Sequence, residues 1–170
     1  YFPHYRSGLW IYVAVENGFE AERWFGSASV YRRGKLGKAL VQGDVLRRVP
    51  GPGLQLPAGV AGRMAGAEAQ RHYDSPPPLR VWPGPQWDWF READRDAFFT
   101  REWTVTPECD RAGYRLAGRQ LKPQPAELIS EPVRVGSVQV PPAGQPIVFM
   151  RDGPTVGGYP KLGVVDPADL

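Results

Sequence analysis

The stretch "PPAGQPIVFMRDGPTVGGYPKLGVV", residues 141–165, decides the fold. It contains an apolar run at 144–150, which predicts a buried strand, and a second strand-like run at 159–165. The residues between the runs include Arg-Asp-Gly-Pro at 151–154, a composition typical of a turn. We therefore expect the two runs to pair with each other as a β-hairpin.

Short strands joined by tight turns are predicted for much of the chain. Its 170 residues include 20 glycines and 19 prolines without a collagen period, which favours many turns. Only 86–103 shows convincing helical spacing, with acidic residues in its first half. The fold class is therefore mainly β with one main helix, and the pattern favours a closed or nearly closed β-barrel. Further strands are expected at 7–18, 39–41, 45–49, 79–86, 103–110, 111–118 and 128–140.

Composition narrows the possible functions. The net charge is only +3 and the arginines are scattered, so nucleic-acid binding is not supported. No apolar run reaches the length of a membrane span. Cys109 is the only cysteine, which excludes an internal disulfide and favours a reduced, cytoplasmic protein. One cysteine and two histidines without ligand spacing do not indicate a metal site, and no phosphate-loop motif is present.

The end of the predicted hairpin is the first candidate site. Gly157 and Gly158 allow the backbone to come close to a ligand, because no Cβ stands in the way. Thr155 adds a hydroxyl, Tyr159 a phenol and Lys161 a cation. The alternative is that the glycines serve only the turn.

A second candidate group lies at 111–115. If this segment is extended, Arg111 and Arg115 share a face and can converge on one carboxylate, bicarbonate or phosphate, with Tyr114 between them. The alternative is that both arginines are solvated surface charges.

A third group combines hydroxyl, carboxylate and amide side chains. Ser130 and Glu131 offer a hydroxyl and a possible base, and Gln139 and Gln145 offer amides that suit a lactam or urea-like ligand. The alternative is that these residues form hydrogen bonds at strand ends.

The order of several motifs resembles one known family. The chain contains "LRVWPGPQ", "DRAGYRLAG", "ISEPVRVGSVQVPPAGQPIVFM" and "TVGGYPKLGVV" in this order, and all are similar to motifs of the biotin-dependent carboxyltransferase family. Its members include the C-type subunit of 5-oxoprolinase, KipA proteins and a domain of urea carboxylase, also known as the allophanate hydrolase domain. The departures are mainly in the earlier part, where Glu16 and Asn17 stand in place of two glycines and Ala28 in place of arginine.

This resemblance implies a cyclophilin-like β-barrel and a two-lobed whole protein. Residues 1–50 would be the end of a first β lobe, 51–78 a Pro/Gly/Ala-rich linker or loop, and 79–170 most of a second lobe, so that the chain would be a piece of something longer. Positions that match the family's motifs include the candidate residues above together with Gln86, Asp110, Gly113 and Pro160.

The resemblance also implies alternative activities. The first is a role within bacterial ATP-dependent 5-oxoprolinase, where the chain would work with a KipI-like protein (the B-type component) and a further subunit. ATP would be used by the complex, and no cofactor is assigned to this chain. Within it, Tyr159, Lys161 and Glu131 would be catalytic and an arginine would clamp the substrate carboxylate. The second is biotin-dependent carboxyl transfer to a urea-like substrate. The third is KipA-type binding of a kinase inhibitor.

Overall fold

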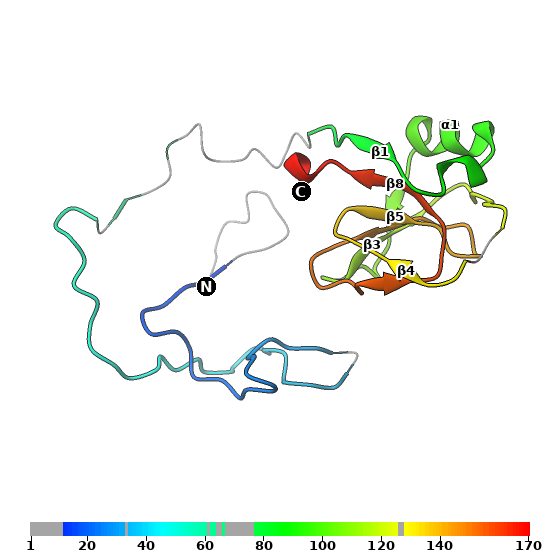
Figure 1. Ribbon diagram of the computed structural model, residues 1–170. Helices are drawn as coiled ribbons and strands as arrows, with labels where there is room; N and C mark the ends of the chain where they lie inside the picture. Colours follow the sequence, from blue (N-terminus) through cyan, green and yellow to red (C-terminus); the bar gives the residue numbers. More distant parts are fainter. Residues whose placement is uncertain (1–11, 33, 61, 64–65, 67–76, 126–127) are drawn as a thin grey trace. The chain divides into compact units, whose positions relative to one another are not determined.

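The structure is a computed structural model that describes residues 12–32, 34–60, 62–63, 66, 77–125 and 128–170. The chain divides into two compact units, Tyr1–Pro76 and Pro77–Leu170. Their relative placement is not determined, and each unit is considered by itself (Figure 1). The assignment of residues 1–50 and 79–170 to successive lobes stays a prediction.

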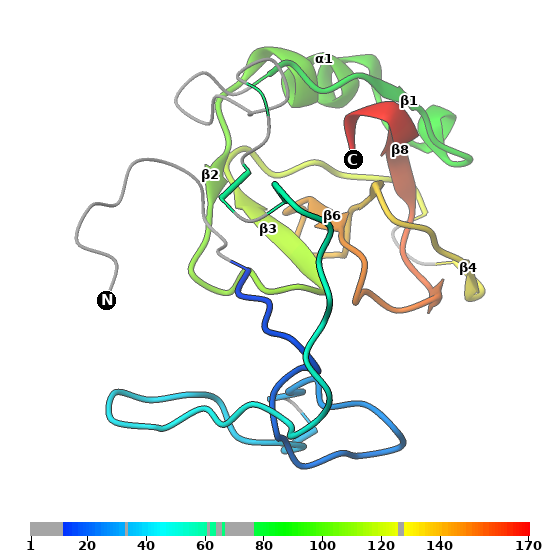
Figure 2. The same ribbon diagram turned by 90° about the vertical axis from the view of Figure 1, so that its left-hand side faces the viewer.

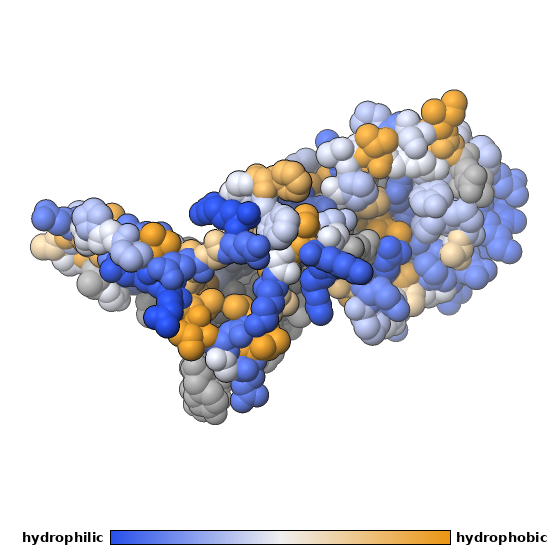
Figure 3. All heavy atoms as spheres, turned by 90° about the horizontal axis from the view of Figure 1, so that it is seen from below, coloured by the Kyte–Doolittle hydropathy of each residue, from blue (hydrophilic) through white to orange (hydrophobic). Residues whose placement is uncertain are grey.

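Unit 1 contains turns and isolated bridges in its described part, but no regular strand. The predicted strands at 39–41 and 45–49 are therefore wrong, although the turn between them exists, with Asp44 N–H donating to the Val41 carbonyl at 3.1 Å. The predicted strand at 7–18 lies partly outside the described residues, and 12–18 is not a strand. Many large apolar side chains of this unit are exposed, and Figure 3 shows apolar atoms, in orange, at the molecular surface.

Unit 2 holds all the named strands and helices of the described chain. The predicted helix at 86–103 is shorter and is split into a 3-10 turn and an α-helix, because Phe90 and Arg91 both have extended backbone angles. The elements are β1 Val81–Pro83, η2 Trp87–Trp89, α1 Glu92–Thr100, β2 Thr104–Val105, β3 Gly113–Ala117, β4 Glu131–Pro132, β5 Ser137–Gln139, β6 Ile147–Phe149, β7 Val156–Gly157, β8 Lys161–Val165 and η3 Pro167–Asp169.

The strands form an antiparallel sheet of six strands in the order β1-β8-β5-β6-β3-β2 and a separate two-stranded ribbon, β4-β7. The mainly β class with one α-helix is confirmed. The expected closed barrel is not: the described sheet is open, with β1 and β2 at its edges. Figures 1 and 2 show the strands of this unit from two sides.

The predicted hairpin between 144–150 and 159–165 is wrong. β6 and β8 are not neighbours, because β5 lies between them and pairs with both. Ser137, Val138 and Gln139 are each at most 2% exposed, so β5 occupies the centre of the sheet. The connection from β6 to β8 crosses β5 and contributes β7 to the ribbon.

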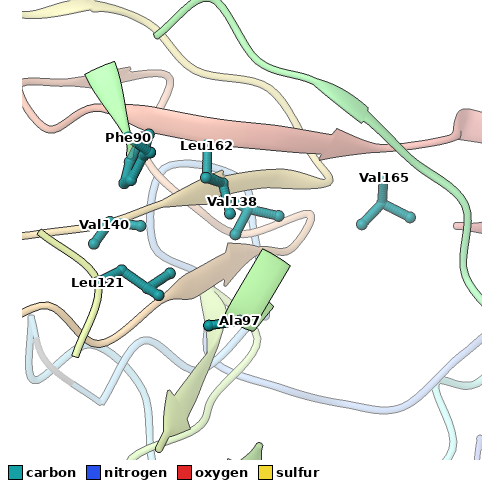
Figure 4. Close-up of a cluster of buried hydrophobic side chains, with 7 residues drawn as sticks. All are labelled: Phe90, Ala97, Leu121, Val138, Val140, Leu162 and Val165. Atoms are coloured by element: carbon teal, nitrogen blue, oxygen red, sulfur yellow. The ribbon is translucent and has the colours of Figure 1, made fainter. Parts of the chain in front are cut away.

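One face of the sheet forms the hydrophobic core of unit 2. Partly buried aromatic residues, among them Trp87, Trp89 and Phe98, pack against a cluster of fully buried side chains. Figure 4 shows this cluster gathered between β8, β5 and neighbouring segments. Its members are Phe90, Ala97, Leu121, Val138, Val140, Leu162 and Val165.

A bulge in β8 separates core residues from polar ones. Val138 pairs with Gly163, but the next residue of β5, Gln139, pairs with Lys161, so Leu162 is an extra residue on β8. Leu162 is fully buried in the core. Because paired residues in an antiparallel sheet share a face, Lys161 shares its face with Gln139, opposite to the core.

Candidate functional site

An ion pair between Lys161 of β8 and Glu131 of β4 is the centre of the candidate site. The ammonium group contacts Oε1 of Glu131 and also donates to the carbonyl of Pro132 at 3.3 Å. The side chain of Lys161 is 5% exposed and that of Glu131 is 33% exposed. A charge buried to this degree requires a partner, and Glu131 supplies it from the edge of the site.

Gln86 connects both members of the ion pair. Its Nε2 donates to Oε1 of Glu131 at 2.8 Å, and its Oε1 accepts from the backbone N–H of Lys161 at 3.0 Å. The hydrogen bond from Lys161, supported by the one from Gln86, lowers the pKa of the Glu131 carboxyl against the opposing effect of its burial. Glu131 is therefore ionised at neutral pH.

Gln139 lies beside this pair and supports the ribbon. Its Nε2 donates to the carbonyl of Tyr159 at 3.0 Å, and its side-chain amide lies directly against Gly157. Gly158 lies beside the hydroxyl of Ser130 in the same way. These contacts give both glycines a packing role, while their expected role in ligand binding stays a prediction.

The structure brings six of the predicted site residues into this region. Lys161, Glu131, Gln139, Gly157, Gly158 and Ser130 are linked by the contacts above. The backbone carbonyl of Tyr159 joins the network, while its side chain makes the residue 39% exposed. Thr155 is exposed, and its carbonyl accepts from the Val133 N–H at 2.8 Å, which anchors the ribbon.

Tyr114 and Arg115 are neighbours on β3 that face opposite sides of the sheet. Tyr114 pairs with Val148, which packs against the core. Arg115 pairs with Ile147, which in turn pairs with Gln139, so Arg115 shares a face with the Lys161 site. Two strand spacings place the Arg115 and Gln139 backbones about 10 Å apart.

Arg111 and Gln145 make contacts elsewhere. Nε of Arg111 forms an ion pair with Asp152 at 2.9 Å, and both side chains are about half exposed. The amide of Gln145 bonds to both backbone groups of Gly118, at 2.9 and 3.2 Å. In this structure Gln145 therefore fastens β3 to the segment before β6.

Gln86 is the residue that interpretation of the sequence left out of the candidate site. It belongs to the motif "LRVWPGPQ", and it is a polar side chain immediately before a cluster of aromatic residues. Its burial, with only 7% exposed, was the missing information. Burial is the property that distinguishes a structural or functional glutamine from a surface one.

The arrangement combines a proton acceptor, a cation and amide groups in one place. An ionised carboxylate can take a proton, an adjacent ammonium can stabilise an oxyanion, and the amides can recognise neutral polar groups. No cluster of possible metal ligands occurs among the residues that the structure describes. In the same part of the chain, no helix has the length and apolarity needed to cross a bilayer.

Comparison with known proteins gives one family match and several relatives. The family described as "Carboxyltransferase domain, subdomain A and B" matches residues 2–170. The chain is 34% identical over 172 residues to the C-type subunit of 5-oxoprolinase from Haemophilus influenzae, and 35% identical over 165 residues to that from Escherichia coli K12. Each match covers 96% of this chain and 51% of the relative, so the chain spans about half the length of these proteins. Urea amidolyase of Lachancea kluyveri is more distant, with 24% identity over 188 residues, 96% of this chain and 10% of that protein.

Solved structures show the same relationship. A crystal structure of TTHA0988 is 33% identical, superimposes with a TM-score of 0.57, and is matched over 90% of this chain and 28% of that one.

Proposed function

Because this chain belongs to the carboxyltransferase domain family of subdomains A and B, we propose that it is part of an ATP-dependent 5-oxoprolinase, which opens 5-oxoproline to glutamate. The relatives named as C-type subunits of 5-oxoprolinase support this assignment. Within the proposal, ATP is handled by partner subunits, among them a KipI-like protein. A cytoplasmic location and a complete cyclophilin-like barrel, to which strands outside this chain would contribute, belong to the same proposal.

The observation that carries the proposal is the buried pair of Lys161 and Glu131 between two glutamines. Opening a lactam requires water to attack the ring carbonyl, the C–N bond to break and the nitrogen to gain a proton. In our proposal Glu131 takes the proton of the attacking water and returns it to the nitrogen, and Lys161 stabilises the oxyanion. The amides recognise the lactam, and Arg115, on the same face of the sheet, binds the substrate carboxylate.

The test is 5-oxoproline-dependent ATP hydrolysis by the full-length protein assembled with its partner subunits. Lys161→Met and Glu131→Gln should each reduce turnover by about a hundredfold or more, as expected for loss of an oxyanion-stabilising group or a base. Lys122→Met, the same change at an exposed lysine, is the matched control. Full turnover by Lys161→Met in a correctly assembled complex would exclude the proposed site.

Biotin-dependent carboxyl transfer to a urea-like substrate is the second candidate. It is favoured by the relatives named urea amidolyase and by the two glutamine amides, which can pair with the C=O and N–H groups of a ureido ring. The discriminating experiment supplies biotin carboxylase, a biotinylated carrier and labelled bicarbonate. Label transferred to urea or an amide, without 5-oxoproline turnover, would favour this candidate.

Regulatory binding of a kinase inhibitor, as described for KipA proteins, is the third candidate. Trp82 is 59% exposed and could anchor a partner. Co-purification with a KipI-like protein, in the absence of turnover by the assembled complex, would favour it. Loss of that binding in Trp82→Ala, with binding retained in Lys161→Met, would place the contact outside the polar site.

A further inference from the structure

We propose that Gln86 is a positioning residue that holds Glu131 by one carboxylate oxygen and presents the other, Oε2, to the substrate. This inference rests on the proposed function for the chemistry of Glu131. The geometry of Gln86 itself is independent of that function.

The main chain on both sides of Gln86 is fixed by packing. On one side Gly84 lies against β8, where its N–H donates to the Leu162 carbonyl at 2.9 Å. On the other side Trp87 and Trp89 pack against the core, and Phe90 is 2% exposed. A side chain that projects from such a segment has little freedom to move, which is the requirement for a positioning residue.

The amide of Gln86 continues the sheet where β1 ends. β1 pairs with β8 as far as Pro83 and Gly163, after which the chain turns away. The next outward-facing N–H of β8, that of Lys161, donates to Oε1 of Gln86 instead of to a strand. A backbone N–H can only donate, so the amide oxygen must face Lys161 and the NH₂ group must face Glu131. The orientation of the amide is therefore determined by its partners.

This orientation engages one oxygen of Glu131. Oε1 accepts from both Gln86 and Lys161, whereas Oε2 has no hydrogen-bond partner among the described residues. Since the Glu131 side chain is 33% exposed, the carboxylate is not closed off from solvent. A carboxylate held by one oxygen cannot rotate without breaking both bonds, which leaves Oε2 as the proton acceptor.

Two variants of Gln86 separate positioning from simple structural support. Gln86→Leu removes the donor at similar volume and should lower kcat by about tenfold or more with a smaller change in KM. Gln86→Glu keeps the shape, but at neutral pH it places a second carboxylate against Glu131. Once protonated, a carboxylic acid at position 86 can again donate to Glu131, so this variant should recover activity toward acidic pH.

The experiment combines kinetics of the full-length complex with a titration that needs no substrate. Side-chain carboxyl NMR of the labelled full-length protein should show a raised pKa for Glu131 in Gln86→Leu, because the charged partner Lys161 remains while the neutral donor is lost. Gln120→Leu, at an exposed glutamine, is the matched control for both measurements.

An unchanged Glu131 titration in folded Gln86→Leu would overturn the positioning role, as would a Gln86→Glu pH–rate profile identical to that of the wild type. If instead the wild-type complex shows no 5-oxoproline turnover while the Glu131 titration shifts as expected, the proposed function fails and the geometric role of Gln86 stands.

Discussion

Gly157 of β7 lies so close to Gln139 of β5 that a β-carbon at position 157 would be 2.5 Å from Nε2 of the glutamine. Cγ2 of Val133 would lie 3.1 Å from the same β-carbon. Gln139 cannot easily move aside, because it is 2% exposed and bonded to the Tyr159 carbonyl. The β4-β7 ribbon therefore depends on a missing side chain for its contact with the sheet.

We expect Gly157→Ala to lower the free energy of unfolding by about 1–3 kcal/mol, the usual range for an overpacked site. The measurement is urea unfolding of the full-length protein. Gly158→Ala is the matched comparison, with its nearest contacts at 3.2 and 3.3 Å, and should cost less. Equal effects of the two substitutions would contradict the packing role of Gly157.

Gly84 makes a closer contact, and with backbone rather than side-chain atoms. A β-carbon there would lie 2.3 Å from the Lys161 carbonyl oxygen and 2.9 Å from the Gly163 nitrogen. Because a paired strand cannot move aside as a side chain can, Gly84→Ala should destabilise more than Gly157→Ala, by at least about 2 kcal/mol. Gly53→Ala, whose nearest contact is 3.7 Å, is the control in the same unfolding assay. A Gly84→Ala protein as stable as this control would show that β1 and β8 can separate at low cost.

The sequence predicted elements better than it predicted their partners. Turn residues and apolar runs located most of the strand regions of unit 2, since these signals are local. The hairpin between 144–150 and 159–165 was wrong because nothing in either run indicates that β5 would be inserted between them. The helix was predicted too long because the aromatic residues at 87–90 continue the helical spacing, whereas the extended backbone at Phe90 ends the first turn.

The candidate site shows the same limit. Residue chemistry identified Glu131, Lys161 and Gln139 as polar groups of interest, but not their contacts, which join β4, β5 and β8. Gln86 acquires its meaning only from burial beside β8. The bulge at Leu162, which directs Lys161 away from the core, has no signature in the sequence that separates it from a regular strand.

Acid should weaken the attachment of η3 to β1. Arg80 bonds to the Asp169 carboxylate through its guanidinium and its backbone N–H, which lowers the pKa of Asp169 to about 2. The unfolded value is about 3.9, so the stabilisation is complete above that pH and is lost as the pH falls toward 2. The difference in stability between the wild type and Asp169→Asn should therefore be constant near neutral pH and shrink below about pH 4.

Urea unfolding at a series of pH values, followed by tryptophan fluorescence, measures this difference. Asp88→Asn is the control: its pair with Arg95 is 3.4 Å long and the carboxylate is 92% exposed, so it should contribute little at any pH. A stability difference for Asp169→Asn that is as large near the acid end of the series as at neutral pH would contradict the assigned role of the carboxylate.

The Lys161–Glu131 pair should show strong energetic coupling in a double-mutant cycle. Lys161→Met leaves a carboxylate without its cation, and Glu131→Gln leaves a buried ammonium without its anion; each should cost about 2–4 kcal/mol, with the larger loss for Glu131→Gln because Lys161 is the more buried partner. The double variant should be less destabilised than the sum, with a coupling above about 1 kcal/mol. Arg111→Gln with Asp152→Asn provides the matched cycle for a half-exposed pair, where the coupling should stay below about 1 kcal/mol. Similar couplings in the two cycles would mean that burial adds nothing to the Lys161–Glu131 contact, and the polar site would then be an ordinary surface ion pair.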